Sequence, residues 1–308
     1  MTTVLGDVTT DQFETVLPHE HTFIRLWAAP GRFDGVHQVE DEGVLAEEVG
    51  QLRQGRDLDA CLVDLTTPDL GRRPAAIRAV AEASGVAIVM GCGWYREPYY
   101  RPEDRLDRRS VDDLATELIR EISDGVDGVR PGVIGEIGVD KDFVSALEER
   151  VHRAAGRAQV ATGLGIATHS LWSDVGLAQL DIFEHEHVDL ARVAVGHVDR
   201  YPYEPYVVEV ARRGAFLMFD NIGDQSPGYE ERVIRLLTML MSRGHEHQIL
   251  LSQDISKDHQ LRSMGGSGYT YLRETFVPRL MAAGVSAAEI RRMTVDNPTN
   301  WLAGRARD

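Results

Sequence analysis

Eight short apolar runs alternate with helical patterns along this 308-residue chain, and this alternation restricts its fold more than any other feature. When a helix separates consecutive strands, the strands pair in parallel, and eight such units close into a barrel. The sequence therefore predicts an α/β protein, a (β/α)8 TIM barrel forming a single domain over residues 1–308. The runs lie near residues 16–24, 60–67, 86–95, 132–140, 165–170, 193–200, 215–222 and 249–256.

The segments between the runs carry helical signals. Ser110 with Asp113 and Ser286 with Glu289 form capping-box patterns, which mark helix starts. The last part of the chain, 269–308, is predicted to hold helices that close the barrel. Helices are predicted over 43–55, Val111–Ile122, 143–162, Tyr229–Met241, Tyr269–Ala283 and Ala287–Val295.

Side chains of the kinds that bind metals stand at or near the C-terminal ends of five runs. In a barrel of parallel strands, these ends share one mouth, where residues from different strands meet. His19 and His21 are two positions apart on a strand, so their side chains face the same side. Imidazole and carboxylate ligands suit divalent transition metals, so the pattern predicts metal-assisted hydrolysis. The candidate ligands are His19, His21, Glu136, His169, His197 and Asp254.

Glu136 bears on the number of metals, because it lies within an otherwise apolar run. A buried carboxylate is costly unless a cation or a proton neutralises it. Its two oxygens can bridge two metal ions, although a protonated or arginine-paired core glutamate is the alternative. Asp254 can complete the site beside His19 and His21, or it can cap the helix that follows.

Bulk composition limits the partners. A net charge of −16 argues against nucleic acid and against an anionic membrane as partners. We expect a small-molecule substrate as the partner, with a homodimer as an open alternative to a monomer. The sequence shows neither an apolar run of membrane-spanning length nor a secretion-signal pattern. Cys61 and Cys92 lie in apolar runs, and we interpret them as reduced core residues of a cytoplasmic protein.

Motifs spread over the whole chain resemble those of the phosphotriesterase family of the amidohydrolase superfamily. The metal-site matches are His19-x-His21, Glu136 within Gly-Glu-Ile-Gly, His169, His197, and Asp254 within Leu-Ser-Gln-Asp. Further matches are Phe219-Asp220-x-Ile222-Gly223, Gly265-Gly266-x-Gly268-Tyr269-x-Tyr271, Pro278-x-Leu280 and Asn297-Pro298.

This resemblance implies a (β/α)8 barrel that holds two divalent metals, usually zinc, with Mn²⁺, Co²⁺ or Fe²⁺ as alternatives, and a bridging hydroxide. By position, His19, His21 and Asp254 would hold the buried metal, and His169 and His197 the more exposed one.

Glu136 occupies the bridging position, as in the glutamate-bridged phosphotriesterase homology proteins of that family. The nearby Lys141 lies past the strand end, so a carboxylated-lysine bridge is not expected.

Members of that family hydrolyse lactones, carboxylic esters, N-acyl amides and phosphotriesters, so the resemblance does not fix the substrate. We expect hydrolysis at a carbonyl, in a lactone, carboxylic ester or N-acyl amide, because aromatic residues of the loops after the first and third runs would narrow the mouth. Phosphotriester hydrolysis on the same site is the first alternative, and a one-metal deaminase or a non-catalytic metal-binding barrel is the second. Asp254 would accept the proton of the attacking water. Asp199, two residues past His197, would orient a ligand or relay the proton, or it would cap its loop.

The long segments 25–39 and 94–109 follow the first and third runs, and loops after strands form the mouth of such a barrel. The aromatic residues of these loops, and Trp172 after the fifth run, can line an apolar pocket or pack in the core. An arginine such as Arg200, at the end of the sixth run, can bind an anionic group of the substrate. The candidate substrate contacts are Trp27, Trp94, Tyr95, Tyr99, Trp172 and Arg200.

Overall fold

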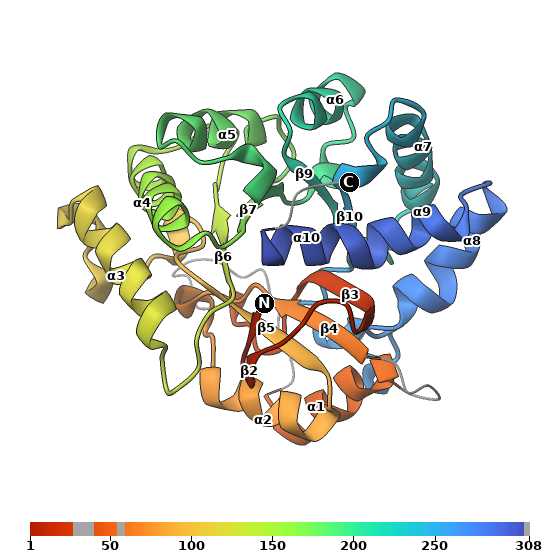
Figure 1. The fold of residues 1–308 in the computed structure, drawn as a ribbon, viewed down its shortest axis with the longest axis horizontal. Helices are drawn as coiled ribbons and strands as arrows, with labels where there is room; N and C mark the ends of the chain where they lie inside the picture. The colour runs from red at the N-terminus through yellow and green to blue at the C-terminus, as the bar shows by residue number, and fades with distance from the viewer. Residues whose placement is uncertain (27–39, 54–58, 305–308) are drawn as a thin grey trace.

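The structure, a computed structural model, describes residues 1–26, 40–53 and 59–304 and shows one sheet of eight parallel strands ringed by helices (Figure 1). Each strand pairs in parallel with the next along the chain, so the predicted TIM barrel is confirmed. The strands are β3 (Phe13–Glu20), β4 (Asp59–Asp64), β5 (Ala87–Cys92), β6 (Val133–Gly138), β7 (Ile166–His169), β8 (Val193–Val195), β9 (Phe216–Phe219) and β10 (Ile249–Leu251).

The barrel closes where residues beyond β10 meet β3. The backbone N–H of Asp254 donates to the carbonyl of His19 at 3.2 Å, and the N–H of His21 donates to the carbonyl of Ile255 at 3.2 Å. Between them, the Ser252 hydroxyl accepts from the His19 N–H at 3.0 Å and lies 2.9 Å from the His19 carbonyl. This seam places Asp254 beside the two histidines of the first strand.

Alternating strand positions build two apolar layers, as the two-residue period of a strand requires. Leu17, Leu62 and Ile88 belong to the layer shared with the surrounding helices. Val16, Val63 and their equivalents face the other way and fill the barrel, together with side chains of the last helix. That helix, α10 (Asn297–Ala303), crosses the end of the barrel in Figure 1, so the base is packed shut and chemistry is restricted to the opposite mouth.

The outer helices follow the strands in the predicted order, and the capping boxes at Ser110 and Ser286 are confirmed. A small hairpin of β1 (Thr2–Thr3) and β2 (Gly6–Asp7), which the sequence did not predict, precedes the barrel. Every helix of the described residues is too short or too polar to cross a lipid bilayer. The ring consists of α1 (Glu42–Gly50), α2 (Pro74–Ser84), α3 (Val111–Asp124), α4 (Ala146–Thr162), α5 (Gly176–His185), α6 (Glu204–Arg212) and α7 (Tyr229–Ser242).

The closing region differs from the two continuous helices predicted there. It contains α8 (Val277–Ala282), α9 (Ala287–Arg291) and α10, with π-helical segments at Leu272–Phe276 and Arg292–Asp296. Each π-helical segment ends two residues before a proline, Pro278 or Pro298. Proline donates no backbone hydrogen bond and crowds the carbonyl four residues earlier, so the turn before it widens.

Candidate metal centre

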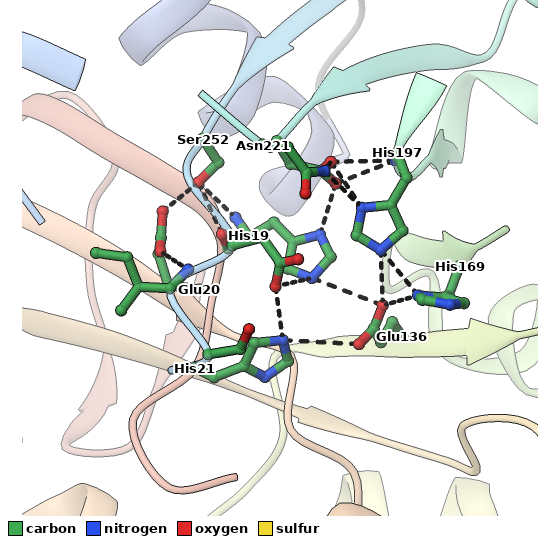
Figure 2. Close-up of polar contacts among 12 residues, drawn as sticks. His19, Glu20, His21, Glu136, His169, His197, Asn221 and Ser252 are labelled. Atoms are coloured by element: carbon green, nitrogen blue, oxygen red, sulfur yellow. Dashed lines mark hydrogen bonds and ion pairs between the residues drawn. The ribbon is translucent and has the colours of Figure 1, made fainter. Parts of the chain in front are cut away.

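The predicted ligands converge at the mouth of the barrel (Figure 2). Five of them are almost completely buried, which is unusual for charged and polar side chains without partners. Their ring nitrogens and carboxylate oxygens form two compact groups that share Glu136. The groups are His19, His21 and Glu136, and Glu136, His169 and His197.

The first group brings together side chains from the end of β3, from β6 and from the segment that follows β10. Nε2 of His19 lies 3.6 Å from Oε2 of Glu136, and Nε2 of His21 lies 3.6 Å from Oε1 of the same carboxylate. Asp254 approaches from the seam, with its Oδ1 3.3 Å from Nε2 of His21 and 3.7 Å from Nε2 of His19. Two imidazoles and two carboxylates therefore surround one point.

The second group lies on the other side of Glu136. Oε2 of Glu136 is 3.0 Å from Nδ1 of His169 and 3.6 Å from Nε2 of His197. The two imidazoles are themselves close, with Nε2 of His197 2.8 Å from Nδ1 of His169. One carboxylate thus stands between two sets of nitrogen donors.

Asp220 holds one histidine of each group, and its role was missed in the sequence. Its Oδ2 lies 2.7 Å from Nδ1 of His19 and its Oδ1 lies 2.8 Å from Nδ1 of His197. A carboxylate that accepts the Nδ1 proton leaves the Nε2 lone pair available to a metal. Asp220 can also join His19 and His197 as a metal-binding group by distance alone, but its contacts are to the far side of both rings. The apolar strand that ends in Asp220 was the available signal.

The donor set fits divalent metal ions. The buried Nε2 of His19 has no hydrogen-bond partner among the described residues, although a buried polar atom normally has one. Glu136 and Asp220 are also buried, at 2% and 0% exposure, and need positive charge nearby. A cation between Glu136 and the histidines would meet both requirements.

The electrostatics of the centre favour positive charge. Burial alone would lower the pKa of His19, but the carboxylates of Asp220 and Glu136 raise it to about 9. Burial likewise opposes protonation of His197, yet Asp220 holds its pKa well above the usual value. Burial would raise the pKa of Glu136, but His169 and His19 hold it well below its ordinary range. The carboxylates therefore remain charged and stabilise cations beside them.

Asp199 lies one layer away from these ligands. Its Oδ2 accepts the Asn221 backbone N–H at 3.0 Å and the Tyr229 hydroxyl at 2.6 Å. Burial and the neighbouring Asp220 raise its pKa to about 6. Asn221 connects it to the centre, with its Nδ2 3.1 Å from Nδ1 of His197. The roles expected of Asp199, which are orienting a ligand, relaying the proton or capping its loop, stay predictions.

Of the predicted substrate contacts, Tyr95 comes nearest to the centre. Its hydroxyl lies 3.1 Å from Nε2 of His169, and the two ring centroids are 4.6 Å apart. Tyr99 packs edge-on against Tyr95 at 5.3 Å. A buried carboxylate, Asp69, accepts the Tyr95 backbone N–H at 2.9 Å and fixes this loop.

For the other candidate substrate contacts, the structure gives no contact with the proposed metal ligands among the residues that it describes. Trp94 is 5% exposed and belongs to the apolar layer beneath the helices. Trp172 is 68% exposed, and the guanidinium of Arg200 lies 5.8 Å from its ring. Trp27 lies outside the described residues.

Glu20 is a further buried carboxylate that the sequence reasoning overlooked, although it separates His19 from His21. It accepts hydrogen bonds from the Ser252 hydroxyl at 2.7 Å and from the backbone N–H groups of Gln253 at 2.9 Å and Ile255 at 2.8 Å. These contacts fix the backbone on both sides of Asp254.

His169 is also held from behind. Its carbonyl lies 3.1 Å from Nε2 of Gln179, and this amide is 3.0 Å from Nε2 of His152. Nδ1 of His152 lies 2.8 Å from the carbonyl of Glu148, which sets the ring as a donor at Nδ1 and an acceptor at Nε2. Burial lowers the pKa of His152 to about 4, so the imidazole is neutral.

The chain is similar to known proteins over nearly its whole length. The sequence profile of the phosphotriesterase family matches residues 1–302. The phosphotriesterase homology protein of Escherichia coli (strain K12) is 34% identical over 290 residues, which is 93% of this chain and 97% of that protein. A structure of that E. coli protein with phosphate in its active site superposes with a TM-score of 0.88, at 32% identity, covering 95% of this chain and 99% of the other.

Two other similar proteins carry named activities. An N-acetyltaurine hydrolase of Mus musculus is 27% identical over 340 residues, covering 97% of each chain. A lactonase of Listeria monocytogenes has a TM-score of 0.89 at 25% identity and covers 98% of each chain. Both names describe hydrolysis at a carbonyl group.

Proposed function

Because this chain belongs to the phosphotriesterase family, we propose that it is a binuclear, zinc-dependent hydrolase acting at the carbonyl carbon of a small molecule. The sharing of Glu136 between two groups of ligand atoms carries this proposal. Its Oε1 faces His21, and its Oε2 lies between His19 of the first group and His169 and His197 of the second. A carboxylate with donors on both sides suits two cations, whereas a one-metal deaminase would need no bridging group.

Two divalent ions held there would lower the pKa of a water molecule toward ~7 and would polarise the carbonyl oxygen of the substrate. The protein supplies the orientation of the ligands. Asp220 fixes His19 and His197, and Thr66 fixes His21 through a 2.9 Å contact between its Oγ1 and Nδ1. Zinc is the first choice because imidazole and carboxylate ligands suit it, although Mn²⁺, Co²⁺ or Fe²⁺ accept the same donors.

Asp254 is the proposed general base. Its side chain is 20% exposed, whereas those of the five histidine and glutamate ligands are at most 5% exposed. It is therefore the ligand that can take a proton from water at the centre and pass it to the leaving group or to solvent. Glu20 supports this role, because it holds the backbone on both sides of Asp254.

A carbonyl substrate is supported by the wall of the mouth and by the relatives. Tyr95 stands against His169, and Tyr99 backs it, so one side of the centre is narrowed by aromatic rings. A planar carbonyl group fits such a space more easily than a phosphorus centre with three substituents. The lactonase points to lactones and the N-acetyltaurine hydrolase to N-acyl amides, and carboxylic esters offer the same carbonyl carbon to an attacking water.

Phosphotriester hydrolysis is the second candidate, since the similar E. coli structure contains phosphate in its active site. A substrate panel separates the two. We expect kcat/KM for at least one lactone, aryl ester or N-acyl amide, N-acetyltaurine included, to exceed the value for paraoxon. A paraoxon value above every carbonyl substrate would reverse the order of the candidates.

A further inference from the structure

A pocket of about 650 Å³ lies beside the metal centre, and none of the steps above uses it. This volume is typical of a small-molecule binding site. The residues that follow β9 and β10 form most of its lining. They include Asn221–Ser226 after β9, and Lys257 and Gly265–Gly268 after β10.

The pocket adjoins the metal centre. Asn221 lines it and also lies 3.1 Å from Nδ1 of His197, as the close-up in Figure 2 shows for these two side chains. On the other side, Gln253 and Ile255 line it and flank Asp254 in the chain. The pocket and the metal centre therefore share Asn221 as a common wall.

Arg200 is fixed at one wall of the pocket. Its Nη1 lies 2.6 Å from Oδ2 of Asp224, and its Nη2 donates to Oδ1 of Asn221. The guanidinium is also 5.4 Å from the ring of Tyr229. Asp224 balances its charge, but a guanidinium has five N–H donors and retains the capacity to bind another oxygen.

Lys257 adds a second positive charge to the lining of the pocket. It is exposed, lines the same pocket and has no acidic partner in the part of the chain that the structure describes. The backbone N–H groups of Ser256 and Lys257 both donate to Oε1 of Gln260, at 3.0 and 2.9 Å, so its turn is fixed. The chain carries a net charge of −16 and has only two lysines, which makes a lysine here informative.

We propose that Lys257, with Arg200, binds an anionic tail of the substrate while the carbonyl group lies at the metal centre. The tail would be an oxyanion such as a sulfonate or a carboxylate. This inference rests on the proposed hydrolase function, because it assigns the substrate class of that site. Charge-assisted hydrogen bonds recognise such groups, and Asp224 and Asn221 hold Arg200 ready to form one.

The test measures binding rather than turnover. Calorimetric titration of the metal-loaded protein would compare propane-1-sulfonate, a weak metal ligand, with the neutral propane-1-sulfonamide. We expect the sulfonate to bind more tightly and Lys257→Met to weaken it about tenfold, as expected for loss of one bond to a charged group. Lys257→Arg should retain binding.

Lys141, the other lysine, is exposed and stands outside this pocket, so Lys141→Met is the matched control and should not change binding. Equal affinities for the sulfonate and the sulfonamide in the unmodified protein would overturn the proposal, as would equal losses in both lysine variants. Absence of hydrolysis over the whole substrate panel would instead count against the proposed function, and the binding result would still stand.

Discussion

Asp220→Asn is the substitution that most sharply tests how the centre is organised. Asp220 accepts hydrogen bonds from the Nδ1 atoms of His19 and His197 at 2.7 and 2.8 Å, and it is fully buried. Asparagine has nearly the same shape but only one acceptor oxygen. Its amide group would face the second imidazole N–H as another donor, so one of the two histidines would lose its support.

The size of the effect follows from these contacts. A hydrogen bond to a charged group is worth about 1.5–3 kcal/mol, and about 1.4 kcal/mol corresponds to a factor of ten in affinity. Loss of one such bond therefore predicts metal binding that is roughly 10–100-fold weaker, the usual cost of removing a residue that supports a metal ligand. The loss should fall on the metal position whose histidine faces the amide group, because Asp220 supports one histidine from each group.

The assay is competition for metal between the protein and a chromophoric chelator, with circular dichroism to verify that the fold is retained. Asp224→Asn is the control, since Asp224 lies in the same loop but pairs with Arg200 instead of a metal ligand. Unchanged metal affinity in folded Asp220→Asn, or an equal loss in the control, would refute this reasoning.

Three further predictions follow from the same contacts. Glu136→Gln should lose metal and activity together, whereas Lys141→Ala should keep both; elemental analysis and rate measurements decide. Asp254→Asn should stay folded and lose ~10²–10⁴-fold in kcat, and a near-native kcat would remove it from the mechanism. Burial lowers the pKa of His152 from 6.5 to about 4. The unfolded chain therefore takes up this proton at a higher pH than the folded protein does, so the free energy of unfolding should fall by up to about 3 kcal/mol as the pH drops between these values. Denaturant titrations of the protein and of His152→Gln check this, and an identical pH dependence would contradict it.

The sequence predicted the barrel and the candidate ligands because both depend on local patterns. Each strand is a short apolar run, and His19, His21 and Glu136 stand at positions that face the mouth once strands pair in order. The position of a histidine at a strand end follows from the strand order and does not depend on the conformation of the loops.

Features that depend on contacts between distant segments were not predictable in this way. Asp220 looks like any acidic residue after a strand until its oxygens are found against rings from two other strands. The pairing of Arg200 with Asp224 and the place of Lys257 in a common pocket likewise depend on how two loops lie together. Loop conformation follows from these tertiary contacts rather than from periodicity.

The metal content of the protein tests the central claim most directly. Protein purified without chelator and then reconstituted with zinc should contain about two divalent ions per chain by elemental analysis. In Glu136→Gln the content should fall, because the amide that replaces the shared carboxylate carries no charge to stabilise two cations. A firm ratio of one ion per chain after reconstitution would contradict the binuclear centre and with it the proposed hydrolytic mechanism.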